Sequence, residues 1–307
     1  MTRVSSKLTV FLIAISCSVG YAGDRFEAPS ILRAFYSHSI SLQKYKVLVE
    51  RYESAVKPDG ASFQLKQVQL IFADLEKKSL TIRGFDEVEN GGVIERGLKS
   101  VSVSNGKATF LRSDGTVESK NSKKFLDTLK LAGETDLRSI GHLPYPIPFG
   151  LFEKLDKLYA PAGSYQLAYS KNETTAKIVF DMPTKTPIRR TFWFDTYNST
   201  PYKLRNTWFR KNTNEWIVSH EEDIEWAEQD GFRVPRRIIG FGLKSGVNKK
   251  GKKEYYRIDR ELNLTWCSVN KDIRDTEFAF VKDIRAIKKE ISSIRESNVQ
   301  DDPKNSE

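Results

Sequence analysis

The chain offers few residues that could carry catalytic chemistry. Its three histidines, His38, His142 and His220, lie far apart in the sequence. The segment that begins at His220 reads His-Glu-Glu-Asp-Ile, so it lacks the second histidine of the zinc-protease pattern and lies in a strand pattern. No Gly-x-Ser-x-Gly sequence marks a hydrolase nucleophile, and the run Gly240–Gly246 lacks the Gly-Lys-Ser ending of a phosphate loop. We therefore predict no metal, no cofactor and no enzymatic activity; a secreted hydrolase assembled from distant carboxylates is the alternative.

Polar side chains interrupt two apolar strand patterns near the end of the chain. In residues 216–226, His220 and Glu222 share a face with tryptophans, provided that no bulge shifts the alternation. In residues 255–266, Arg260 interrupts a similar face. Arg260 could then meet Glu222 or His220, either as a structural ion pair or as the polar anchor of an apolar groove. The candidate ligand-binding residues are Trp216, His220, Glu222, Trp226, Arg260 and Trp266.

The first 22 residues have the pattern of a secretory signal peptide. A basic start precedes the apolar run Leu8–Ile15, and small residues place the expected cleavage between Ala22 and Gly23. The apolar run is shorter than the roughly 20 residues that span a bilayer. Lipid attachment at Cys17, which follows this run, is the alternative. We expect an exported protein, located in the periplasm or outside the cell.

Composition predicts a chain that is not an integral membrane protein and does not bind nucleic acid. Charged residues make up 29% of the chain, the mean hydropathy is −0.50, and no later stretch is long and apolar enough to cross a membrane. The net charge of +10 is dispersed among acidic residues, and no nucleic-acid motif accompanies it. Cleavage of the signal would leave Cys267 alone, which excludes an internal disulfide and favours a buried, inert thiol.

The body of the chain reads as antiparallel β structure around a helical insert. Pro29 precedes a short amphipathic helix, and Asn105-Gly106 and Asp230-Gly231 have the composition of hairpin turns. Helical spacing and prolines in residues 121–160 predict the insert, after which strand patterns resume over residues 163–266.

Two features near the end of the chain could contact other molecules. Ile284, Ile287, Ile291 and Ile294 form a stripe on a predicted helix at 281–297, which could pack on its own domain or on a helical partner. The lysines of residues 244–253 predict a solvated hairpin loop, with contact to an anionic surface as the alternative. The tail at 298–307 is predicted to be disordered.

Three stretches resemble the bacterial LolA/LolB-like superfamily of exported lipoprotein-carrier-like proteins. They are Val101–Phe110, the pair Thr191–Asp195 and Thr200–Leu204, and the pair Ile224–Trp226 and Asp230–Pro235. The resemblance covers about residues 26–280. It implies an incomplete antiparallel barrel whose helices cap an apolar cavity, and it assigns no individual functional residue.

These observations predict a mainly β protein with an α insert, built as an antiparallel half-barrel with capping helices. Its expected parts are a signal peptide at 1–22, the half-barrel at 23–280, an amphipathic helix at 281–297 and the tail. The expected function is non-enzymatic binding of a lipid-like or apolar ligand, or of a lipidated protein, in a concave sheet. The alternative is a cell-envelope interaction or sensor protein that uses the C-terminal helix or the lysine-rich loop.

Overall fold

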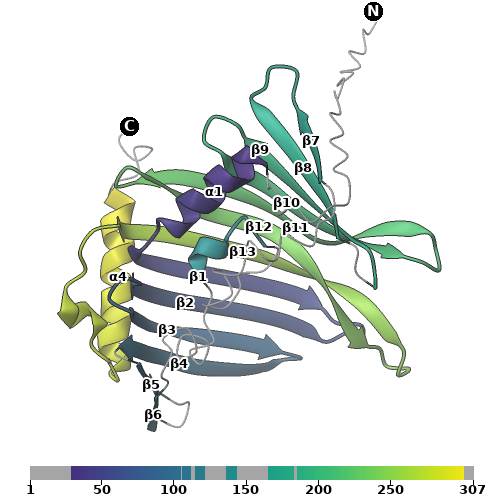
Figure 1. Cartoon of the computed structure of the whole chain (residues 1–307). Helices are drawn as coiled ribbons and strands as arrows, with labels where there is room; N and C mark the ends of the chain where they lie inside the picture. Colours follow the sequence, from purple (N-terminus) through teal and green to yellow (C-terminus); the bar gives the residue numbers. More distant parts are fainter. Residues whose placement is uncertain are drawn as a thin grey trace, which may run out of the picture.

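A single open sheet dominates the computed structural model, which describes residues 29–104, 106–111, 115–121, 136–143, 165–182 and 185–300 (Figure 1). Within these residues thirteen antiparallel strands form a sheet that does not close, which confirms the predicted mainly β half-barrel. The residues of the predicted signal peptide and of its expected Ala22–Gly23 cleavage site, most of the predicted insert at 121–160 and residues 301–307 lie outside the described part.

The strand order follows the sequence except at one ladder in the middle of the sheet. The order is β6-β5-β4-β3-β2-β1-β13-β12-β11-β10-β9-β8-β7, so the two halves of the chain meet where β1 pairs with β13. The strands are β1 (Lys44–Val56), β2 (Ser62–Asp74), β3 (Ser79–Asn90), β4 (Val93–Ser104), β5 (Lys107–Leu111), β6 (Val117–Asn121), β7 (Tyr165–Tyr169), β8 (Thr175–Met182), β9 (Ile188–Asp195), β10 (Thr200–Arg210), β11 (Glu215–Gln229), β12 (Phe232–Val247) and β13 (Lys253–Val269).

Two tight turns confirm the hairpins predicted from Asn-Gly and Asp-Gly. Ser104 pairs with Lys107 across a turn in which Gly106 has a φ of 74°. Gln229 pairs with Phe232 across the second turn, where Asp230 and Gly231 have φ values of 54° and 73°. In the second turn both central positions have positive φ, which matches the right-handed twist of the flanking strands and favours these residue types.

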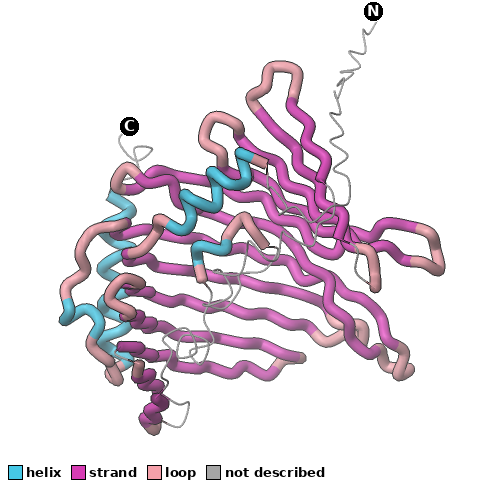
Figure 2. Tube along the Cα trace, in the orientation of Figure 1, coloured by secondary structure: helices cyan, strands magenta, loops and turns pink. Residues whose placement is uncertain are grey.

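The inner face of the sheet is the one covered by helix α1 (Ser30–Ile40) and by residues 136–143, which include the 3-10 turn Leu137–Ser139 (Figure 2). Leu137 and Ile140 pack on the part built from β1 to β4 and β11 to β13. Leu32 and Phe35 of α1 pack on β8, β9 and β10. The inner face therefore holds most of the buried apolar side chains.

The outer face is covered by helix α4 (Ile284–Gln300), compared with the expected span of 281–297. Ile287, Ile291 and Ile294 of the stripe are buried against β1 and β2, whereas Ile284 is exposed. Arg83 on β3 donates to both carboxylate oxygens of Glu290, at 3.0 and 2.8 Å. Three of the four stripe residues thus pack on the chain's own sheet, as predicted for a helix that packs on its own domain.

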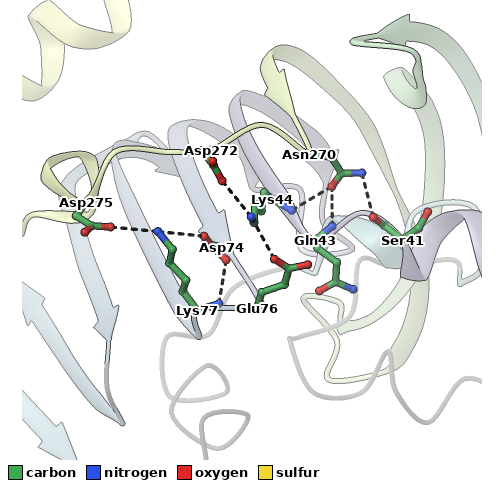
Figure 3. Close-up of polar contacts among 9 residues, drawn as sticks. All are labelled: Ser41, Gln43, Lys44, Asp74, Glu76, Lys77, Asn270, Asp272 and Asp275. Atoms are coloured by element: carbon green, nitrogen blue, oxygen red, sulfur yellow. Dashed lines mark hydrogen bonds and ion pairs between the residues drawn. The ribbon is translucent and has the colours of Figure 1, made fainter.

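A corner cluster of polar residues connects the segment before α4 to the rest of the sheet (Figure 3). Lys44 on β1 lies 3.1 Å from Glu76 and 3.1 Å from Asp272. The side chain of Asn270 accepts from the backbone N–H of Gln43 at 3.0 Å and donates to the carbonyl of Ser41 at 3.0 Å. The chain leaving β13 is thereby fixed to the corner between α1 and β1.

Candidate functional site

A row of charged residues crosses the middle of the inner face. Glu222 on β11 lies opposite Gly240 on β12, Gly240 lies opposite Arg260 on β13, and Arg260 lies opposite Glu53 on β1. Residues that are paired across a ladder point to the same face of a sheet, so Glu222, Arg260 and Glu53 form one row. The sequence places Glu222 and Arg260 in this row correctly, and the structure adds Glu53.

The charges in this row are paired and largely withdrawn from solvent. The Nε atom of Arg260 lies 2.8 Å from Oε1 of Glu53, and Arg51 donates to the same oxygen at 2.5 Å. Nε2 of His220 lies 2.9 Å from Oε1 of Glu222. The side chains of Glu53 and Glu222 are only 3% and 9% exposed. Removing one member of such a buried pair leaves an uncompensated charge, which is strongly destabilising.

Gly240 makes room for this row. A Cβ atom at this position would lie 2.8 Å from Cγ of Glu222 and 2.2 Å from the backbone oxygen of Glu221. A glycine in a strand interior commonly marks such a close approach. The absence of a side chain at Gly240 therefore allows the Glu222 side chain to lie over β12, toward Arg260.

A bulge moves Trp216 away from the predicted group. His220 pairs with Asn206 and Val218 pairs with the next residue, Thr207, so Ser219 is an extra residue on β11. An extra residue reverses the alternation, and Trp216 therefore lies on the outer face, where the guanidinium of Arg189 sits 4.5 Å from its ring centroid. The prediction that Trp216 shares a face with His220 and Glu222 is wrong for this reason.

Trp226 and Trp266 lie on the inner face but belong to its packed core. The indole N–H of Trp226 donates to the carbonyl of Pro201 at 2.7 Å, and that of Trp266 donates to the carbonyl of Pro235 at 2.6 Å. The Trp226 ring meets Phe35 of α1 edge-on, at 5.7 Å between centroids. Neither indole lines the cavity described next.

A small cavity of about 50 Å³ lies between the charged row and residues 136–143. Its apolar wall consists of Val49, Ile71, Leu137, Ile140, Leu143, Ile238 and Leu262. Its polar lining includes Arg51, Gln67, Gln69, Glu222 and Arg260. The volume accommodates only a few heavy atoms, so a larger ligand would have to displace residues 136–143 from the sheet.

Gln69 is the group in the cavity that most clearly lacks a partner. The residue is 2% exposed, and within the described part of the chain its amide Nε2 has no hydrogen-bond partner. A buried donor without an acceptor costs about 1–3 kcal/mol. A ligand oxygen placed in the cavity would satisfy this amide. Sequence analysis missed Gln69, because a single glutamine in a strand pattern carries no signal of its own.

Residues 136–143 are held by their own polar contacts. Asp136 is fully buried and accepts from the guanidinium of Arg138 at 2.9 and 2.7 Å. Nε2 of His142 lies 3.0 Å from the hydroxyl of Ser39, and the imidazole stacks on Phe35 at 4.1 Å. Burial, with a smaller contribution from His38, lowers the pKa of His142 to about 3. The imidazole is therefore neutral at physiological pH and anchors this segment to α1.

Other reactive chemistry is sparse among the described residues. They contain no group of three or more His, Cys, Asp or Glu side chains that could hold a metal ion. Burial raises the pKa of the Cys267 thiol, which lowers its reactivity. No helix in the described ranges combines the length and apolarity that membrane crossing requires.

Comparison with known proteins gives similarities in structure only. No protein-family model matches the sequence, and no curated protein matches it. A domain from Vibrio parahaemolyticus, provisionally described as an outer membrane lipoprotein-sorting protein, is 9% identical, with 84% of this chain and 97% of that domain covered and a TM-score of 0.37. A porin-like protein from Bacteroides uniformis is 8% identical, with 74% and 97% covered and a TM-score of 0.23. Both TM-scores lie below 0.5, so neither similarity supports a function for this chain.

Proposed function

We propose that the chain is an exported, non-enzymatic protein that binds an apolar or lipid-like ligand, or the lipidated end of a protein, on the inner face of its sheet. The observation that carries this proposal is the cavity beside Gln69, which combines a mostly aliphatic wall with one buried and unpartnered amide. Small-molecule sites have this combination of an apolar wall and a few convergent polar groups. The signal-peptide pattern of residues 1–22 supports export.

In this proposal binding follows from burial of the ligand's apolar part. Each buried methylene group contributes about 0.8 kcal/mol, so a chain of ten methylenes offers about 8 kcal/mol. Part of that energy offsets the displacement of Leu137, Ile140 and Leu143 from the sheet. Gln69 would donate to a ligand oxygen and so fix the orientation of the polar end, because its amide gains a hydrogen bond only when the ligand is present.

The first test is mass spectrometry of organic extracts from the protein purified after export with its own signal. We expect a stoichiometric lipid, fatty acid or other amphiphile. Displacement of a fluorescent fatty acid then provides a titratable assay. In that assay Ile238→Trp, which fills the cavity, should weaken probe binding about tenfold or more, as a loss of about 1.4 kcal/mol produces.

A matched control lies one residue further along the same strand. Ile239 points to the outer face and is 41% exposed, so Ile239→Trp adds the same indole without entering the cavity. It should leave the probe affinity unchanged. Equal affinities for both variants, or wild-type protein that carries no ligand and binds no probe, would contradict binding on the inner face.

A further inference from the structure

Two neighbouring hairpins separate at the end of the sheet opposite α4 (Figure 1). The ladder between β11 and β12 ends where His220 pairs with Gly242, so the β10–β11 and β12–β13 hairpins continue beyond it without pairing to each other. Between them lies an open groove of about 670 Å³. It is lined by Trp208, Arg210, Asn212, Lys252, Lys253, Glu254 and Tyr255, and we call it the hairpin groove.

Two aromatic rings line the hairpin groove, and cationic side chains lie beside them. The rings of Trp208 and Tyr255 meet across the groove at 5.4 Å between centroids, and Tyr255 is 52% exposed. The guanidinium of Arg210 lies 5.4 Å from the centroid of the Trp208 ring. Outside the groove lining, at the end of β12 in the same hairpin as Tyr255, Val247 carries an aliphatic side chain that is 59% exposed. The groove therefore presents apolar and positively charged groups side by side.

The turn between β12 and β13 adds a concentrated positive charge. The backbone of this turn is held by Asn248, whose side-chain oxygen accepts from the backbone N–H groups of Lys250 and Lys252, both at 2.9 Å. Residues 208–216 and 244–255 together contain seven lysines and arginines and two carboxylates. The turn lysines, all exposed, are Lys249, Lys250, Lys252 and Lys253.

We propose that the hairpin groove and the turn lysines dock on the surface of an anionic lipid bilayer. Anionic headgroups complement the positive charge, and the exposed Tyr255 and Val247 side chains, with the half-buried Trp208 beside them, are the kinds of group that enter the boundary between headgroups and acyl chains. A soluble polyanion would use the lysines and leave the exposed aromatic and aliphatic groups in water. This surface lies away from the cavity beside Gln69, so the inference is independent of the proposed ligand.

The test is flotation of the full chain with vesicles. One set contains phosphatidylcholine alone, and the other contains about a quarter phosphatidylglycerol. We expect binding to the anionic vesicles at about 0.1 M salt and its loss at about 1 M salt, where charges are screened within a few ångströms. Equal binding to both vesicle sets, or no binding to either, would overturn the proposal.

Replacing the four turn lysines by glutamine tests which surface is responsible. A lysine near an anionic membrane contributes roughly a fivefold factor in partitioning, so the quadruple variant should lose roughly several hundredfold. The control removes the same charge from α4 and the segment just before it, at the other end of the sheet, and should change partitioning by less than about threefold. It replaces by glutamine the exposed cations Lys282, Arg285, Lys288 and Lys289. Equal losses in the two variants would refute docking through the hairpin groove.

Tyr255→Ser distinguishes a membrane from a soluble polyanion. The variant should lose about fivefold to tenfold in vesicle partitioning and should keep its retention on dextran sulfate, because the ring contributes only where it can leave water. Thermal unfolding of each variant checks that the exposed substitutions leave the fold intact. If Tyr255→Ser leaves vesicle binding unchanged while the lysine variant loses both activities, the partner is a soluble polyanion and the bilayer proposal is wrong.

Discussion

The imidazole of His142 makes stability depend on pH in a direction that the structure determines. In the folded protein the ring is buried between Ser39 and Phe35, and its pKa is lowered to about 3 from an ordinary value of 6.5. Between pH 6.5 and pH 3, His142 binds a proton in the unfolded chain and stays neutral in the folded chain. The folded state therefore loses stability as the pH falls from 6.5 toward 3, and above 6.5 this contribution is constant.

The size of the effect follows from the two pKa values. The full difference of about 3.5 units corresponds to roughly 5 kcal/mol at pH values below both. At pH 5 the unfolded histidine is almost completely protonated and the folded one is neutral, which gives a loss of about 2 kcal/mol. With a urea m-value of about 3 kcal/mol per molar, this loss moves the midpoint of unfolding by about 0.7 M.

Urea unfolding of the wild type and of His142→Gln, each at pH 7.5 and pH 5, measures the contribution of His142 to the pH dependence of the free energy of unfolding. Glutamine can keep a hydrogen bond to Ser39 and has no proton to gain, so whatever it costs at pH 7.5 cancels in the comparison. Carboxylates elsewhere titrate equally in both proteins. The wild type should lose about 2 kcal/mol more than the variant on going to pH 5. Equal losses would show that His142 is accessible to protons in the folded state, contrary to its burial.

Three further predictions test the packing and the charged row by urea unfolding. Ile291→Ala should lower the free energy of unfolding by about 2–5 kcal/mol, whereas Ile284→Ala on the same helix should change it by less than about 0.5 kcal/mol; similar values would mean that α4 is not docked as described. Glu53→Gln should lower the free energy of unfolding by about 3–5 kcal/mol by leaving buried cations unpaired, and adding Arg260→Met should recover part of that loss. A double variant less stable than the single variant would argue against the pairing of Glu53 with Arg260. Gly240→Ala should cost more than about 1 kcal/mol because its Cβ meets the backbone of β11, and a neutral result would exclude that close approach.

Much of the fold could be predicted because its signals are local. Alternating side chains mark the strands, and Asp230-Gly231 supplies the positive φ that its turn needs. The isoleucine spacing of α4 is also a local signal, because residues three and four apart share one face of a helix, and it predicts a packed helix face. The surface under that face could not be predicted, because the buried cluster that holds Ile291 also holds Leu48, which is remote from it in sequence.

The candidate site was predictable only in part because it depends on register between distant strands. His220, Glu222 and Arg260 could be placed on inner faces from alternation alone. The bulge at Ser219 could not, because it exists only relative to the pairing with β10, and it sends Trp216 to the other face. Glu53 reaches Arg260 through a ladder that joins the first strand to the last, which no local pattern reports.

That same ladder has a consequence for how the chain folds. Tyr45 pairs with Val269, so the central seam of the sheet joins segments separated by most of the described sequence, while the other ladders join strands that follow one another along the chain. Pairings of such long sequence separation form slowly, because the entropy of closing the loop is lost before the contacts are gained. During synthesis, one edge of β1 would stay unpaired until β13 left the ribosome, and unpaired strand edges favour aggregation. A circular permutant that links the end of α4 to the start of α1 and opens between β6 and β7 would bring β13 and β1 close together along the chain while keeping α4. It should refold faster than the natural order.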